Sequence, residues 1–191
     1  KPSPRPSSLQ SLNIESSFPI ELFKVKLKMD TLTALERLSL RCEEVSFCEG
    51  VCLPPKLQSI MTVCRRATPP VKEWGLRGLT SLSGLSIGKS DDLVNPLMME
   101  SLLPISLKNL DFDYCEFESL PENCFPSSLK KLGLYFCEKL ESLPEDSLPD
   151  SLEMLEIWEC PLLEERYKMK EHWSKIAHIP IIEINGQVTV W

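Results

Sequence analysis

Hydrophobic residues recur along this chain in a short pattern that returns at a nearly constant interval. Three close copies of L-x-x-L-x-[LIF]-x-x-C occur in the second half, and four looser copies precede them. The copies start at Leu9, Leu35, Leu57, Leu82, Leu107, Leu129 and Leu152. Successive starts are 22 to 26 residues apart. Because self-similarity at a fixed period marks a repeat protein, we expect about seven similar units.

Within each copy, apolar and polar positions alternate around the second leucine, as in a half-buried β-strand. One copy cannot bury its leucines alone, so neighbouring copies must stack and align their strands. The period falls within the roughly 20–29 residues of leucine-rich repeats. We therefore predict an α/β repeat solenoid, a leucine-rich-repeat horseshoe with a parallel sheet on its concave face.

Prolines follow the same period. A proline stands three residues before several of the starting leucines, for example at Pro6, Pro104, Pro126 and Pro149. Proline lacks an N–H and fixes φ, so it suits the turn into a strand and resists helix. We therefore expect a convex side that is largely irregular or 3₁₀-helical.

The pattern ends after Cys160, and the remaining composition is different. Residues 162–177 have helical composition, and residues 179–184 read as a strand. Asn185-Gly186 is a turn signal before residues 188–191. An open last coil would expose leucines and a strand edge. We therefore divide the chain into repeats (1–160) and a C-terminal helix-plus-strand cap (161–191).

Composition narrows the class of partner and the compartment. The net charge of -7 argues against a nucleic-acid partner. The sequence has no apolar run of the roughly 18 residues of a membrane span, and its first residues lack the apolar core of a signal peptide. Because residue 1 is not Met, we expect a fragment of a longer chain. Several of the eight cysteines recur in phase with the repeat and no Asn-x-Ser/Thr site occurs, which favours buried thiols in a reducing cytoplasm.

Two motifs suggest enzymatic or metal chemistry, and both have a simpler interpretation. Residues 84–88 match G-x-S-x-G, but Ser86 falls mid-strand and residues 89–92 read as a turn, whereas a hydrolase needs a helix there. Cys48 and Cys52, with Cys42 and Cys64 nearby, suggest zinc, yet the spacing matches no pair of C-x₂-C knuckles. We expect structural roles for these cysteines. No phosphate-binding loop is present, so we predict no enzyme, metal or cofactor in this segment.

The outward strand positions then remain as the candidate binding surface. Tyr135 and Trp158 occupy equivalent positions in adjacent copies, about 4.8 Å apart, and exposed aromatic pairs commonly anchor protein interfaces. The alternative is that the cap buries Trp158. Asp111 and Asp113 would place an acidic patch beside the rings. The candidate partner-binding residues are Arg41, Asp111, Asp113, Tyr135, Glu156 and Trp158.

Four segments carry a more specific resemblance: CPLLEERY (160–167), EHWSKIAHIP (171–180), LPPKLQSI (53–60) and PPVKEWGLRGLTSLS (69–83). They resemble the repeats and tail of plant intracellular disease-resistance receptors of the coiled-coil, NB-ARC, leucine-rich-repeat class, and the resemblance covers nearly the whole chain. It implies a cytoplasmic or nucleo-cytoplasmic protein-recognition domain that senses pathogen effectors directly or through a guarded host protein. It also implies contact with an upstream NB-ARC domain, which would bind ADP or ATP and be restrained by the repeats.

Other classes remain open. A stand-alone leucine-rich-repeat adaptor or scaffold would lack the nucleotide-binding domain, so an upstream phosphate loop in the same transcript separates it from a receptor. A cell-surface ectodomain usually carries L-x-x-L-x-x-N-x-L-x-G-x-I-P repeats, paired terminal cysteines and glycosylation sites, which this sequence lacks.

Overall fold

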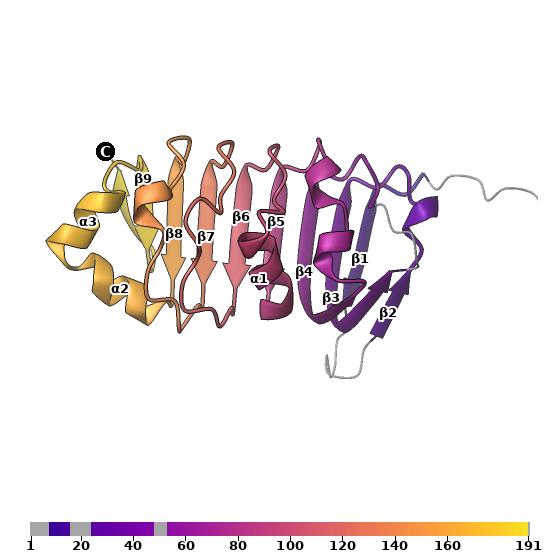
Figure 1. Ribbon diagram of the computed structural model, residues 1–191, viewed down its shortest axis with the longest axis horizontal. Coiled ribbons are helices and arrows are strands. Elements are labelled where there is room, and N and C mark those ends of the chain that lie inside the picture. Colours follow the sequence, from indigo (N-terminus) through magenta and orange to yellow (C-terminus); the bar gives the residue numbers. More distant parts are fainter. Residues whose placement is uncertain (1–7, 16–23, 48–52, 191) are drawn as a thin grey trace, which may run out of the picture.

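The strands form one mostly parallel sheet of ten strands, with few helices (Figure 1). The computed structural model describes residues 8–15, 24–47 and 53–190. Its strands are β1 (Ser11–Glu15), β2 (Lys24–Leu27), β3 (Arg37–Phe47), β4 (Ser59–Thr68), β5 (Gly84–Gly88), β6 (Asn109–Asp113), β7 (Lys131–Tyr135), β8 (Met154–Trp158), β9 (Ile181–Ile184) and β10 (Gln187–Val190). The main path runs β1-β3-β4-β5-β6-β7-β8-β9-β10, with β2 beside β3, and only β10 is antiparallel to its neighbour.

The register of the sheet aligns the positions that the repeat pattern aligned. The second apolar residue of every copy lies in one row: Leu12, Leu38, Ile60, Leu85, Leu110, Leu132 and Leu155. From β3 to β8 these side chains are buried, and the residues that flank them along each strand are mostly more exposed. The predicted parallel strands are therefore confirmed, one per copy.

Two strands are longer than the repeat pattern predicts. β3 has 11 residues and β4 has 10, whereas β5 to β8 have five each. Inward burial continues along β3 through Cys42, Val45 and Phe47, and β2 pairs with this second half. The alternation is interrupted at Cys42 and Glu43, which are both buried, and then resumes at Val45 and Phe47. Beyond the interruption each further apolar side chain again gains a buried position, which favours an extended backbone.

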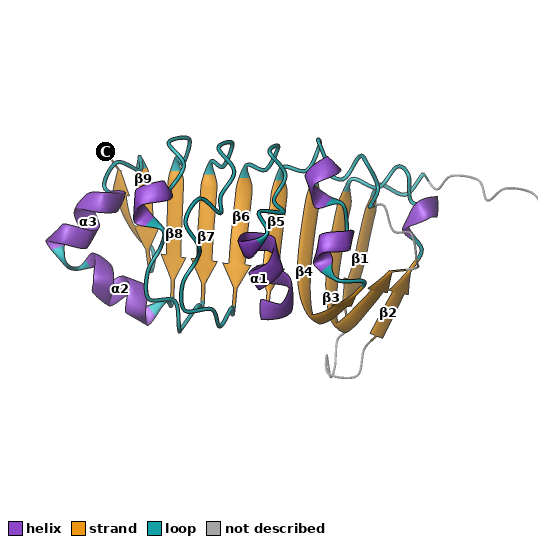
Figure 2. Cartoon of the chain, viewed as in Figure 1, coloured by secondary structure: helices purple, strands orange, loops and turns teal. Residues whose placement is uncertain are grey.

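The return segments are mostly loops and 3₁₀ turns, as predicted (Figure 2). The 3₁₀ turns are η2 (Met29–Thr31), η3 (Val71–Glu73), η4 (Leu76–Gly78) and η5 (Glu145–Ser147). One expectation was wrong: the segment read as a turn at residues 89–92 runs into the helix α1 (Asp91–Met99). Leu93, Val94, Leu97 and Met98 are buried at helical spacing, so tertiary packing of this apolar face stabilises a helix there.

The cysteines of the described residues are buried, as the sequence predicted, and several of them contact buried backbone. All six cysteines of the described residues are free and buried, while Cys48 and Cys52 lie outside those residues. In four cases the thiol donates to a carbonyl of the preceding strand, at sulfur–oxygen distances of 3.5 to 3.9 Å. These cysteines are Cys64, Cys115, Cys137 and Cys160. The contacts are weak, and the main contribution of these residues is packing.

The C-terminal segment contains two short helices instead of the single helical stretch expected over residues 162–177. They are α2 (Pro161–Tyr167) and α3 (Lys170–Ile176), and the backbone of Met169 between them is extended. Tyr167 and Ile176 are both buried. Nine residues of continuous helix would place these two side chains on opposite faces, so the break lets both reach the core.

The chain then adds β9 to the sheet and turns back into β10. Asn185 and Gly186 both have positive φ, 47° and 78°, as a tight type I′ hairpin requires. The predicted turn is confirmed, and the last strand ends at Val190. Among the described residues, no helix is long and apolar enough to cross a membrane.

Candidate functional site

The outward strand residues form two continuous rows on one face of the sheet, here called the open face. The first row contains Asn13, Ser39, Met61, Ser86, Asp111, Gly133, Glu156 and Glu183. The second row contains Glu15, Arg41, Val63, Gly88, Asp113, Tyr135 and Trp158. Because a parallel sheet in register stacks equivalent positions, each row brings together side chains that are 22 to 27 residues apart in sequence.

Five of the six predicted site residues lie together on β6, β7 and β8, and we call Asp111, Asp113, Tyr135, Glu156 and Trp158, with Lys131, the acidic–aromatic cluster. Arg41 is the exception, because it lies on β3, three strands from Asp113, where its guanidinium is 3.4 Å from the carboxylate of Glu15. Burial raises the pKa of Asp113, and the charges of Lys89 and Arg41 oppose this shift. The cluster is therefore local, and Arg41 contributes to it only through its longer-range field.

Gly133 creates the space in which the cluster assembles. A Cβ atom at this position would lie 2.6 Å from Cε2 and 2.8 Å from the hydroxyl oxygen of Tyr135, and closer still to Asp111. These distances are too short for real Cβ contacts, so only glycine allows the Tyr135 side chain to lie across β7 toward Asp111.

A chain of polar contacts then fixes the orientation of Tyr135. Its hydroxyl donates a hydrogen bond to Oε2 of Glu156, and the same oxygen lies 2.7 Å from Nζ of Lys131. Glu156 therefore accepts from a phenol and an ammonium at once. A carboxylate held by two donors stays ionised and holds its partners in place.

The two main carboxylates of the cluster, Asp111 and Glu156, have pKa values shifted in opposite directions. Burial raises the pKa of Asp111, with Lys131 opposing the shift and Glu156 and Asp113 adding to it. Burial also acts against the charge of Glu156, but the hydrogen bonds from Lys131 and Tyr135 outweigh it and lower the pKa of that carboxyl. One Asp111 oxygen, Oδ1, is buried without a hydrogen-bond partner among the described residues. Such a carboxylate gains from any positively charged group brought to this face.

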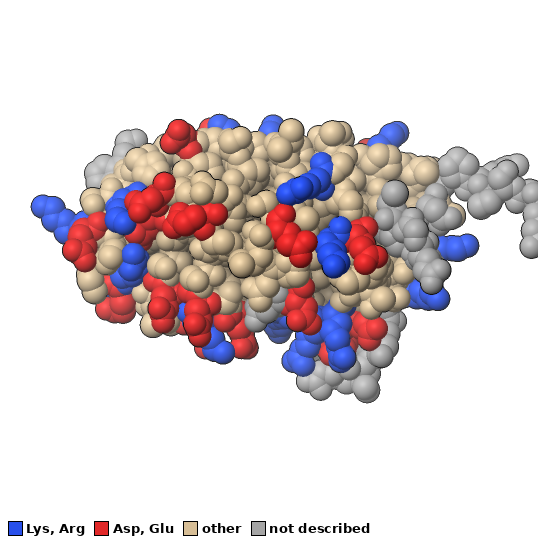
Figure 3. Space-filling view, viewed as in Figure 1, with Lys and Arg blue, Asp and Glu red and all other residues tan. Residues whose placement is uncertain are grey.

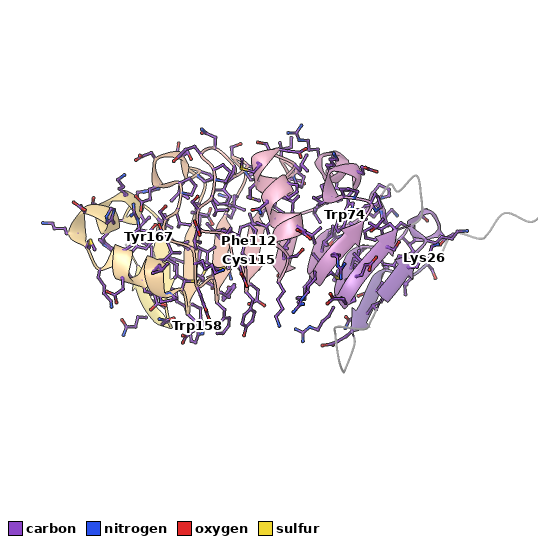
Figure 4. The ribbon with its side chains drawn as sticks, turned by 60° about the horizontal axis from the view of Figure 1, so that its bottom comes forward. Lys26, Trp74, Phe112, Cys115, Trp158 and Tyr167 are labelled. Carbon is purple, nitrogen blue, oxygen red and sulfur yellow. The ribbon has the colours of Figure 1, made fainter. Side chains whose placement is uncertain are left out.

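Trp158 is partly covered and partly free, an outcome between the two alternatives that the sequence left open. Its side chain is 40 % exposed, and Gly186 in the β9–β10 turn lies against its ring. Figure 4 shows Trp158 at the margin of the molecule, whereas Phe112 and Cys115 lie inside it. Tyr135 and Trp158 are register partners as predicted, but their rings make no aromatic contact in the described structure, because Tyr135 turns toward Gly133 and Glu156.

A second feature, which the sequence did not reveal, lies where the strands end. Lys89, Tyr114 and Phe136 each follow a strand and adopt positive φ, between 52° and 57°. The Tyr114 and Phe136 rings stack 4.5 Å apart and nearly parallel, and the ammonium of Lys89 lies 5.0 Å from the Tyr114 centroid. A pattern of apolar periodicity carries no signal for left-handed backbone at bulky residues, since such residues rarely adopt it.

A cavity of about 770 Å³ adjoins this row of rings and extends to β4. Its wall carries four acidic and four basic side chains, among them Arg65 and Arg66, which lie 3.8 and 3.6 Å from the buried carboxylate of Glu43. Figure 3 shows acidic and basic side chains intermingled along the edge where the strands end. Mixed charge beside stacked rings is typical of a wet protein contact rather than of a buried catalytic pocket.

The G-x-S-x-G match coincides with the strand β5, whereas Cys48 and Cys52 of the candidate zinc motif lie outside the described residues. Ser86 lies in the middle of β5, between the buried residues Leu85 and Ile87, as the repeat phase predicts. Within residues 8–15, 24–47 and 53–190, no group of three or more His, Cys, Asp or Glu side chains could hold a metal ion.

Lys131 is the member of the acidic–aromatic cluster that the sequence analysis missed. It occupies the first position of β7, one place before the motif leucine, so the alternation rule alone did not single it out. Its ion pair with Glu156 could have been suggested only by knowing that β7 and β8 are neighbours in register.

Comparison with known proteins gives one distant similarity. Over 139 residues, 71 % of this chain, the sequence is 28 % identical to the Arabidopsis thaliana protein named "Putative disease resistance protein At3g14460". The matched part is 10 % of the length of that protein. No family model and no solved structure matches the chain. The chain thus carries a distant, partial similarity to a segment of a plant disease resistance protein.

Proposed function

We propose that this chain is the protein-recognition domain of a plant innate immune receptor, built as a leucine-rich-repeat solenoid whose open face is the recognition surface. The observation that carries the proposal is the acidic–aromatic cluster. Successive repeats place their outward side chains in register, and on β6 to β8 these side chains are mainly carboxylates and aromatic rings. The similarity to a disease resistance protein supports the plant-defence context.

The chemistry of the cluster favours a protein partner with basic side chains. Asp111, Asp113, Glu156 and Glu183 outnumber Lys131 on this part of the open face. Cationic side chains of the partner would be attracted by this excess of carboxylates. The exposed part of the Trp158 ring offers a flat apolar anchor beside these charges, and such aromatic residues carry much of the binding energy in protein interfaces.

In the full-length receptor, this segment would sense a pathogen effector directly or through a guarded host protein in the cytoplasm. It would also contact the NB-ARC domain and restrain its nucleotide switch until the partner binds. ADP or ATP would be held by that domain, so the present segment would contribute no catalysis and no cofactor site. This division of labour follows from the resemblance of residues 160–180 to the tail of such receptors.

The test uses the full-length receptor co-expressed in leaves with candidate effectors. Trp158→Ala should weaken partner binding at least tenfold, about 1.4 kcal/mol, and reduce effector-dependent cell death, while protein accumulation stays normal. The matched control is Met61→Ala, which removes another exposed apolar side chain from the open face, on β4 and outside the cluster. Equal effects of the two variants, or none from Trp158→Ala, would contradict a recognition role for the cluster.

A second measurement separates the receptor from a stand-alone repeat adaptor. The transcript upstream of Lys1 should contain an in-frame G-x-x-x-x-G-K-[ST] loop if a nucleotide switch precedes the repeats. A start codon directly before Lys1 would contradict the proposed restraint of a nucleotide switch and would favour the stand-alone adaptor.

A further inference from the structure

Cys42 and Cys64 face each other inside the sheet. They are register partners on the neighbouring parallel strands β3 and β4, and both are fully buried. Their sulfur atoms are 2.8 Å apart. Both lie one residue beyond the positions at which the shorter strands β5 to β8 end, so the contact depends on the greater length of β3 and β4.

The other buried cysteines of the repeats are arranged differently. Cys115, Cys137 and Cys160 each follow a residue with positive φ, which ends the strand and turns the thiol toward backbone carbonyls. The backbone N–H of Cys137 donates to the sulfur of Cys160 at 3.4 Å, and a side-chain hydrogen bond with Cys115 raises the pKa of Cys137. β3 and β4 have no such turn at Cys42 and Cys64, so these two side chains point inward side by side from extended backbone.

The short contact gives the two thiols different roles. Either sulfur could be the donor in the hydrogen bond between the two thiols. This hydrogen bond lowers the pKa of Cys64 to about 7 although burial opposes the shift. The same hydrogen bond and burial raise the pKa of Cys42. Because the thiolate is the nucleophile, Cys64 is the attacking group and Cys42 is the resolving one.

We propose that Cys42 and Cys64 form a redox-active pair that a peroxide converts into a reversible disulfide between β3 and β4. The Cys64 thiolate attacks one oxygen of hydrogen peroxide, the O–O bond breaks, and a sulfenic acid and hydroxide form. The sulfur of Cys42 then attacks the sulfur of Cys64, the S–O bond breaks, and water leaves with the thiol proton. In total, two thiols and one peroxide give one disulfide and two waters.

The backbone needs little adjustment to accept this bond. Neighbouring strands are about 4.8 Å apart, within the range of Cα–Cα distances that disulfides span. The sulfur atoms have to approach by about 0.75 Å to reach bonding distance. Because both thiols are buried, the oxidant must enter during local opening of the sheet, so the reaction is slower than for an exposed thiol. The disulfide would close a loop between residues 22 positions apart and stabilise this end of the sheet.

The experiment treats the purified chain with hydrogen peroxide and maps its disulfides by peptide mass spectrometry. We use a background with Cys48→Ser and Cys52→Ser, so that these nearby cysteines cannot compete. The expected product is a linked pair of peptides containing Cys42 and Cys64, lighter by two hydrogens and separated again by a reductant. The melting temperature of the oxidised, intact chain should exceed that of the reduced chain.

Two variants locate the reaction. Cys42→Ser should abolish the linked peptide and leave Cys64 as a sulfenic acid that dimedone traps. Cys137→Ser, the control, removes another buried thiol, which follows β7, and should leave the Cys42–Cys64 link intact. The proposal is overturned if wild-type peptides show no such link in peroxide, or if Cys137 and Cys64 are oxidised at the same rate.

Discussion

At the scale of single residues, the cluster on the open face depends on one missing side chain. Gly133 is buried although it lies in the outward row, because the Tyr135 ring and the Asp111 carboxylate cover it. Tyr135 is in turn held by Glu156, and Glu156 by Lys131. The identity of one small residue therefore decides where an aromatic ring and two carboxylates can lie.

Replacement of this glycine tests that statement. Gly133→Ala should lower the free energy of unfolding by roughly 1–3 kcal/mol, because the new methyl group overlaps Tyr135 and Asp111. Chemical denaturation of the purified chain measures the change. Gly84→Ala is the control, since a Cβ at that position of β5 would meet Ser59 at 3.7 Å, an ordinary contact. We expect less than about 0.5 kcal/mol there, and similar losses in the two variants would argue against the packing explanation.

At the scale of elements, a buried ion pair ties the two C-terminal helices to the preceding return segment. Glu145 in η5 has a side chain that is 3 % exposed, and it accepts hydrogen bonds from Nε of Arg166 at 2.8 Å and from its terminal nitrogen at 3.2 Å. Lys175 of α3 lies 3.5 Å from the same carboxylate. One acidic side chain thus contacts both α2 and α3, which were separated by the break at Met169.

Removal of this charge should destabilise the C-terminal helices in a pH-dependent way. Burial opposes the ionisation of Glu145, but Arg166 outweighs it and keeps the pKa of the carboxyl below its ordinary value of 4.5. A lowered pKa contributes stability above about pH 4.5, and that stability is lost as the pH falls through the folded-state value. Glu145→Gln should therefore cost about 2 kcal/mol at pH 7 and progressively less below pH 4.5, as thermal unfolding across this pH range would show.

The exposed pair between Glu165 and Lys168 provides the control for that prediction. Both side chains are about 70 % exposed, at 71 % and 69 %. Solvent screens such a pair, so Glu165→Gln should change the stability by less than about 0.5 kcal/mol at every pH. If both substitutions gave the same pH profile, the effect would come from net charge rather than from the Glu145 contacts.

At the scale of the whole molecule, the sheet is a one-dimensional stack in which each strand contacts only its neighbours. The strand β8 is paired on its far side by β9, through hydrogen bonds such as that from the Ile181 N–H to the Glu153 carbonyl. β10 then pairs with β9 and carries exposed valines. The last repeat therefore does not present its own edge to solvent in the described structure.

Truncation at this end tests the role of the last two strands. A chain cut to residues 1–180 exposes the edge of β8 and more of Trp158, and an unpaired edge promotes association. We expect its apparent mass, from size-exclusion chromatography with light scattering, to rise with concentration more than that of the uncut chain. Val190→Lys, which changes an exposed residue of β10 and keeps both strands, should behave like the uncut chain. Identical behaviour of the truncated chain would show that β8 needs no cover.

The sequence by itself determined the elements that local periodicity encodes. Alternation around the second leucine of each copy predicted the strands and their alignment, and the order of the outward residues followed, including the pairing of Tyr135 with Trp158. The in-phase cysteines and the Asn185-Gly186 turn were also readable, because each depends on a local pattern or on the backbone preference of one residue.

Only the tertiary structure decided features that depend on neighbours distant in sequence. The extension of β3 and β4, the break between α2 and α3, and the start of α1 at Asp91 all depend on which side chains the rest of the molecule can bury. The same holds at the site. Tyr135 turns away from Trp158 because Gly133 gives it space and Glu156 gives it a hydrogen-bond partner, contacts that arise across strands. Periodicity determines on which face of the sheet a residue lies, and packing determines which neighbours its side chain contacts.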